Sequence, residues 1–233
     1  MIYNQRGFKK LKYKFEQLDL EQLTITKKDN KKCIIFLHGI GGSKISLTGL
    51  ASAFLKKDSS YDLLLPDLPG SGSAVKLSFD DQTFRRWFIL YLGLISKQYD
   101  KVFVLGHSLG AYQCIINADL LNKSCNKLIM VCPVLGLDTI TKTAYHLFNL
   151  ISKVNRDAAT RIVASGAMIR LSNNIMVKGD YKAKSKILIS RLKELDIVNK
   201  KSWFEQCQHI QKIISSSGFK HQLSKVKIST LVI

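Results

Sequence analysis

The residue best placed to do chemistry in this sequence is Ser108, in the run Gly106–Gly110 (GHSLG). Four apolar residues, 102–105, come directly before this run, and residues 111–116 after it can form a helix. A serine on so tight a strand-to-helix turn needs neighbours without side chains two positions away on either side. The pattern predicts an exposed hydroxyl that can act as a nucleophile, with helix N–H groups aimed at whatever group it attacks. The alternative is a tight turn without chemistry, because glycine and serine are common residues.

Two more turn-rich loops follow apolar runs. The glycine-rich segment 38–43 comes after residues 33–37, and the loop Pro66–Ser73 comes after residues 61–65. A phosphate-binding reading of the first loop fails, because Lys44 stands where the third glycine of G-x-G-x-x-G belongs, and the P-loop spacing is also absent.

The segments around these loops alternate between expected strands and expected helices. We predict a β-hairpin from segments 11–15 and 20–25. We predict strands over 33–37, 61–65, 102–105, 128–132 and 227–233, and we expect the strand over 227–233 to be buried. We predict helices over about 45–55, 81–97 and 111–116, the second of them capped by Asp80 or Asp81. Such alternation indicates an α/β fold with a mostly parallel, doubly wound sheet. The three loops then lie together at the carboxyl edge of the sheet, where such folds place their chemistry.

Residues 138–225 have a different pattern, with amphipathic helical segments and no convincing strand. We predict that they form a helical lid over the carboxyl edge of a core made by residues 1–137 and 226–233. Residues 138–226 contain 16 basic and 6 acidic residues, so this region carries about half of the excess positive charge.

The composition bounds the classes of function. The net charge of +19 fits an anionic partner or a lysine-rich surface, but no zinc-finger spacing or RNA-binding signature points to a specific nucleic acid. No apolar run is long enough to span a bilayer, and the N-terminus lacks the apolar stretch of a signal peptide. Five scattered cysteines without a C-x-x-C pair fit reduced thiols, so we expect a cytoplasmic protein.

Three motifs together resemble those of the α/β-hydrolase superfamily, in its serine esterase and lipase branch. They occur in the family's order, as Leu37–Gly42 (LHGIGG), Pro66–Ser73 (PDLPGSGS) and Gly106–Gly110 (GHSLG). The resemblance covers about residues 11–137 and the last expected strand. It implies the α/β-hydrolase fold, and a helical insertion before the seventh large strand is usual in the family.

The resemblance also implies roles for individual residues. Ser108 resembles the nucleophile, and the N–H groups of Leu109 and Ile40 resemble the two halves of the oxyanion hole. Asp67 resembles a structural residue of the loop after the fourth strand. The remaining site residues would support two segments: the strand-to-helix turn at Ser108, called the elbow, and the loop 38–43, called the oxyanion loop. These residues are His38, Gly39, Gly41, Gly106 and Gly110. No metal and no cofactor is implied.

The sequence departs from the family at its end. In this family a catalytic triad joins the serine nucleophile to an acidic residue and a histidine. The acidic residue usually comes from the loop after the seventh strand and the histidine from after the eighth. Here the seventh expected strand ends at Ile233. One account is a truncated chain, without the C-terminal strand and helix that carry both groups. A second is a triad rebuilt from Asp138 with His146, His209 or His221. A third is an inactive relative that binds a ligand or partner.

The function expected from this reasoning is that of a serine hydrolase. Ser108 would cleave a carboxylic ester or thioester through an acyl-enzyme, with a small or lipid-like acyl substrate. The alternative is a catalytically inactive binding protein with the same fold. The basic lid also allows a weak contact with a membrane surface, whereas the sequence predicts no oligomeric state.

Overall fold

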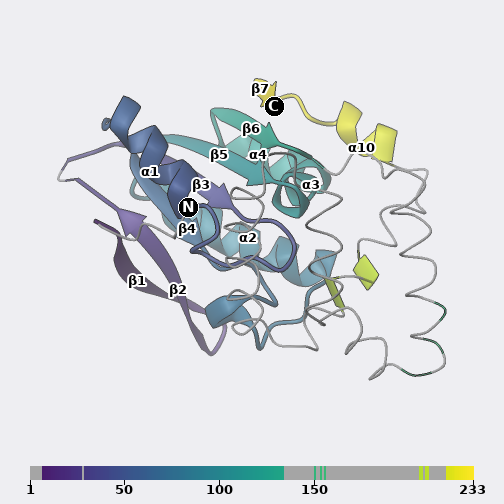
Figure 1. Cartoon of the computed structure of the whole chain (residues 1–233). Helices are drawn as coiled ribbons and strands as arrows, with labels where there is room; N and C mark the ends of the chain where they lie inside the picture. The colour runs from purple at the N-terminus through teal and green to yellow at the C-terminus, as the bar shows by residue number, and fades with distance from the viewer. Residues whose placement is uncertain are drawn as a thin grey trace, which may run out of the picture.

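The computed structural model describes residues 7–27, 29–133, 150, 153, 155, 205, 206, 208, 209 and 219–233. Within this part the strands form one sheet in the order β1-β2-β4-β3-β5-β6-β7. The hairpin of β1 and β2 lies at one edge and β7 at the other, next to the C-terminus (Figure 1). The strands are β1 (Lys9–Phe15), β2 (Leu18–Ile25), β3 (Lys32–Leu37), β4 (Asp62–Pro66), β5 (Lys101–His107), β6 (Lys127–Val131) and β7 (Thr230–Val232).

The sheet is mixed but mostly parallel. Strands β4, β3, β5, β6 and β7 pair in parallel, so their carboxyl ends meet at one edge. The hairpin partner β2 joins β4 in the antiparallel direction. This arrangement confirms the prediction of an α/β fold with a mostly parallel sheet.

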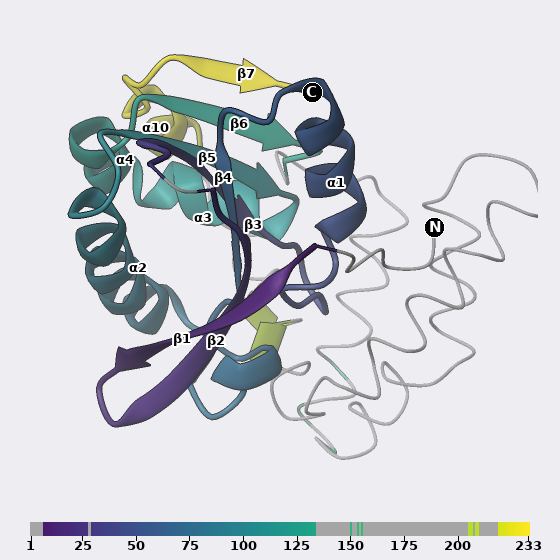
Figure 2. The ribbon, with the colours of Figure 1, turned by 90° about the vertical axis from the view of Figure 1, so that its left-hand side faces the viewer.

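Helices cover both faces of the sheet. Figure 2 shows α1 on one side and α2 and α4 on the other. The helices are α1 (Thr48–Lys57), α2 (Asp81–Ser96), α3 (Leu109–Ile116), α4 (Ala118–Ser124) and α10 (Phe219–Ser224), with a short 3₁₀ turn at Gly72–Ala74.

Alternate residues of β3 enter two different hydrophobic cores. Ile35 and Leu37 pack with the aromatic face of α2, whereas Ile34 and Phe36 pack with the side of the sheet that α1 covers. A strand whose side chains are buried in both directions reads as a continuous apolar run, which is why the sequence predicted β3 clearly.

The start of α2 follows from its capping residue. The Asp80 carboxylate accepts hydrogen bonds from the Thr83 N–H at 2.7 Å and from the Thr83 hydroxyl at 2.9 Å. These bonds satisfy an N–H group that has no partner inside the helix. The cap fixes where α2 begins, at the same sheet edge as the candidate site.

The last strand differs from its prediction. Strand β7 is an exposed edge strand rather than a buried one, with Leu231 55% and Val232 53% exposed. It pairs with β6 on one side only within the described residues, so its side chains are covered much less than those of the central strands.

Most of the predicted lid, 138–225, lies outside the described residues, as do Asp138 and His146. None of the helices that the structure describes is long and apolar enough to cross a membrane.

Candidate active site

Ser108 occupies the turn between β5 and α3 in a strained backbone conformation. Its φ is 52° and its ψ is −113°, values that residues with a side chain rarely adopt. Such a conformation costs on the order of 1–3 kcal/mol and persists only where the surrounding packing enforces it. Here the turn places the serine at the N-terminus of α3, where N–H groups lack partners inside the helix.

Two glycines flank Ser108 because the chain passes too close for a side chain. A Cβ at Gly106 would lie 2.7 Å from the Cα of Ala111. A Cβ at Gly110 would lie 2.4 Å from the carbonyl oxygen of Leu37. Both obstacles are backbone atoms, so neither can move aside cheaply. The helix after Ser108 is thus packed directly against the end of β3.

The loop after β3 also runs against the serine itself. A Cβ added at Gly39 would lie 3.1 Å from the Cβ of Ser108 and 3.0 Å from Nδ1 of His107. Gly39 therefore lets the loop backbone approach the nucleophile candidate. This close approach brings Ile40, the next residue of the loop, to the same part of the sheet edge.

Four successive N–H groups of this loop donate to fixed acceptors. They are those of Gly41 to Oε1 of Gln206 (2.8 Å), Gly42 to the Gly39 carbonyl (3.2 Å), Ser43 to Oγ of Ser46 (2.8 Å) and Lys44 to Oδ1 of Asp67 (2.7 Å). In contrast, no hydrogen bond joins the N–H of Ile40 or of Leu109 to another described residue. Two donors next to Ser108 therefore remain unpaired in this part of the chain.

His38 links the loops after β3 and β4. The Leu68 N–H donates to its Nε2 at 3.1 Å, so Nδ1 carries the proton and donates to the Gly39 carbonyl at 2.9 Å. Burial lowers the pKa of His38, which keeps the ring neutral at pH 7. Both ring nitrogens are thus engaged in holding the backbone around Ile40.

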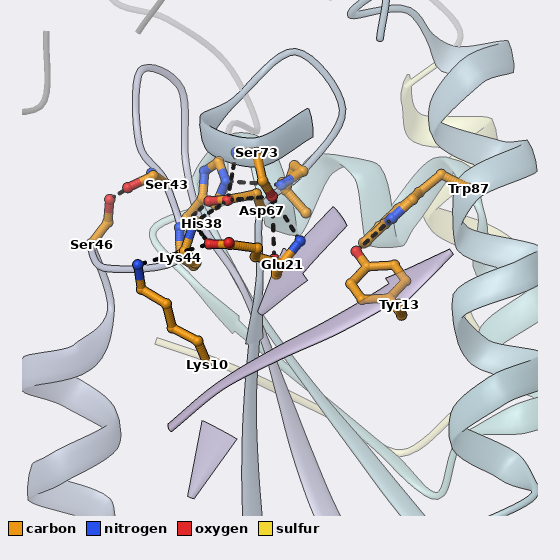
Figure 3. Close-up of polar contacts among 11 residues, drawn as sticks. Lys10, Tyr13, Glu21, His38, Ser43, Lys44, Ser46, Asp67, Ser73 and Trp87 are labelled. Carbon is orange, nitrogen blue, oxygen red and sulfur yellow. Dashed lines mark hydrogen bonds and ion pairs between the residues drawn. The ribbon is translucent and has the colours of Figure 1, made fainter. Parts of the chain in front are cut away.

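Asp67 holds the same two loops by charge. Its carboxylate is fully buried and accepts from Nζ of Lys44 at 2.6 Å, and from the N–H and hydroxyl of Ser73 at 2.8 and 2.9 Å (Figure 3). Nζ of Lys44 also lies 3.4 Å from the carboxylate of Glu21. With four donors on its two oxygens, Asp67 acts as a structural anchor, in keeping with the role that the resemblance implied.

The histidines named as possible bases are placed differently from one another. Nε2 of His209 lies 3.0 Å from Oδ1 of Asp81 and 3.3 Å from Nε2 of Gln113, whereas His221 is exposed on α10. In the part of the chain that the structure describes, no histidine hydrogen-bonds the hydroxyl of Ser108.

Two contacts at the site were not expected from the sequence. In the sequence Lys44 only breaks a phosphate-binding pattern, although a lysine seven residues after a buried strand could have suggested a partner for Asp67. Gln206 lies 165 positions from Gly41, and no local signal connects the two residues. Among the described residues, no group of three or more histidine, cysteine or acidic side chains could hold a metal ion.

This fold and site geometry define a protein of the α/β-hydrolase class. A family model described as "alpha/beta hydrolase fold" matches residues 32–160, which is more than half of the chain. The chain therefore belongs to this family.

Individual relatives are similar at low identity. The chain is 26% identical over 200 residues to a "Putative esterase/lipase 3" of Mycoplasma genitalium, covering 79% of this chain and 69% of the relative. The solved enol-lactonase of Burkholderia xenovorans has a TM-score of 0.71 at 12% identity, covering 95% of this chain and 80% of the other. An esterase of Exiguobacterium antarcticum has a TM-score of 0.64 at 13% identity, covering 92% and 76%.

The likeness to these solved structures shows the fold alone. Across these and the other similar solved structures, the match covers 92–99% of this chain and 70–81% of the other chain.

The neutral state of His38 predicts a pH dependence of stability. Because its pKa is lowered in the folded state, the unfolded chain binds more protons below about pH 6.5, so the free energy of unfolding falls as the pH falls. We expect this residue to contribute to a loss in the free energy of unfolding between pH 8 and pH 5.5. Urea unfolding at both pH values should show a smaller loss in His38→Asn than in the parent protein. An equal loss in His38→Asn and the parent protein would contradict this assignment.

The crowding at the elbow predicts opposite effects for two glycine-to-alanine changes. Gly110→Ala should lower the free energy of unfolding by about 3 kcal/mol, because the new Cβ meets the Leu37 carbonyl. Gly93→Ala, in the last turn of α2 with open space around it, should raise it by about 0.5 kcal/mol. Thermal and urea unfolding measure both. Equal effects of the two changes would refute the close contact.

Proposed function

We propose that this protein is a serine hydrolase that cleaves a carboxylic ester or thioester through an acyl-enzyme on Ser108. The observation that carries the proposal is the strained Ser108, together with the N–H groups of Ile40 and Leu109, for which no described residue supplies an acceptor. A nucleophile and two fixed donors at one point suit a reaction that develops an oxyanion. Membership of the α/β-hydrolase family and the similarity to the esterase/lipase of Mycoplasma genitalium support the same function.

The reaction would proceed in two balanced steps. The Ser108 oxygen attacks the carbonyl carbon while a base takes its proton, and the N–H groups of Ile40 and Leu109 donate to the oxyanion. The tetrahedral intermediate collapses, and the leaving alcohol or thiol departs with that proton. Water then attacks the acyl-enzyme in the same way, which releases the acid and restores Ser108.

A histidine is the base that this chemistry ordinarily uses. Two described histidines are already engaged, since His38 uses both ring nitrogens on backbone groups and Nε2 of His209 faces Asp81 and Gln113. We therefore assign the base to another histidine. The proposal assigns to His38 the support of the oxyanion loop instead of proton transfer.

The proposed substrate class is a small or lipid-like acyl ester or thioester. Support comes from the relative's description as an esterase/lipase and from the apolar helical faces expected in residues 138–225, which could line an acyl pocket. We propose that residues 138–225 form a lid on the core and that this pocket lies above Ser108.

Turnover of p-nitrophenyl esters and acyl thioesters of increasing chain length tests the proposal. In the full-length protein, Ser108→Ala should lower kcat/KM by about 10³-fold or more, because no other group replaces the nucleophile. Ser96→Ala, on the exposed end of α2, is the matched control and should leave turnover unchanged.

Undiminished turnover in Ser108→Ala would refute the assignment of the nucleophile. A protein that turns over no ester or thioester, yet binds an acyl ligand saturably, would refute hydrolysis and support the inactive binding protein instead.

A further inference from the structure

One side chain from the second half of the sequence reaches the loops that surround Ser108. Gln206 is only 1% exposed, and its Oε1 accepts a hydrogen bond from the Gly41 N–H at 2.8 Å. Its Nε2 lies 3.3 Å from Oγ of Ser71 and 3.5 Å from the carbonyl of Gly70. One carboxamide thus bridges the loop after β3 and the loop after β4.

The bond to Gly41 determines which loop donors remain unpaired. Gly41 follows Ile40 directly and has a φ of 65°, so the two neighbouring peptide groups are oriented by the same turn. Because Gln206 takes the Gly41 N–H, the Ile40 N–H is the unpaired one of these two neighbours in the described structure. The direction of the Ile40 N–H therefore depends on the loop backbone that the hydrogen bond from Gly41 to Gln206 holds in place.

Two neighbours of Gln206 hold the same segment against the core. A carboxylate oxygen of Glu205 lies 3.5 Å from the Phe79 N–H, and Nε2 of His209 lies 3.0 Å from Oδ1 of Asp81. The ring of His209 also packs edge-on against Phe79, with 5.3 Å between the ring centroids. These contacts are directed at the stretch that leads into α2, so the position of Gln206 is set independently of its own hydrogen bonds.

We propose that Gln206 is a positioning residue of the oxyanion hole. It withdraws the Gly41 N–H from the hole and fixes the loop so that the Ile40 N–H points at the developing oxyanion. The inference rests on the proposed function of Ser108. It makes the segment at 205–209 part of the apparatus for transition-state stabilisation, although Gln206 touches no reacting atom.

A change of Gln206 to methionine separates positioning from substrate binding. Methionine has a similar length but no group that pairs with the Gly41 N–H. Because misplacing one donor weakens the transition state more than the bound substrate, kcat should fall about tenfold or more while KM changes less than about twofold. Gln98→Met, on an exposed side chain after α2, is the matched control and should change neither constant.

Two further readouts distinguish positioning from general support of the fold. Binding of a trifluoromethyl ketone, which forms a tetrahedral oxyanion on the serine, should weaken in parallel with kcat. Gln206→Glu keeps an acceptor for the Gly41 N–H, so it should retain more activity than Gln206→Met. If the methionine variant does not fold, Gln206→Asn, which is shorter but polar, replaces it with the same expected loss of kcat.

The outcomes separate this inference from the proposed function. A folded Gln206 variant with kcat and ketone binding within twofold of the parent would overturn the positioning role while Ser108-dependent turnover stands. A parent protein whose turnover survives Ser108→Ala would overturn the proposed function, and the role of Gln206 would fall with it.

Discussion

The close approach of the β3 loop to the turn at Ser108 is the constraint on which the rest of the site depends. Backbone atoms of Leu37 occupy the space that a Cβ at Gly110 would need, and Gly39 lies against the Cβ of Ser108. This packing enforces the positive φ of Ser108, and in the proposed site it brings the N–H groups of Ile40 and Leu109 to the serine. The parallel pairing of β3 with β5 sets this distance, because it places the carboxyl ends of both strands at one edge of the sheet.

Three buried polar groups hold the loop in this position. The neutral ring of His38 joins it to Leu68, the carboxylate of Asp67 joins it to the loop after β4, and Gln206 closes it from the distant segment at 205–209. Each group has its polar atoms paired, as burial requires. An oxyanion hole needs such rigidity, because its donors act without reorganising during the reaction.

The sequence predicted the features that rest on local signals. The continuous apolar run of β3, the Asp80 cap of α2 and the strand, turn and helix around Ser108 each follow from a short stretch of chain. Helix α4 was not predicted, because only one residue separates it from α3 and no strong helix-stop signal lies between the two helices. The exposure of β7 and the reach of Gln206 depend on where distant segments lie in space, which periodicity does not encode.

The most direct measurement is the position of a covalent fluorophosphonate adduct on the full-length protein. Such a probe reacts with a serine whose hydroxyl is activated and whose tetrahedral adduct is stabilised by an oxyanion hole. After proteolysis, mass spectrometry should find the phosphonyl group on the peptide that contains Ser108, and Ser108→Ala should remain unlabelled. Equal labelling of the variant, or an adduct on a different serine, would contradict the account that places the chemistry at this turn.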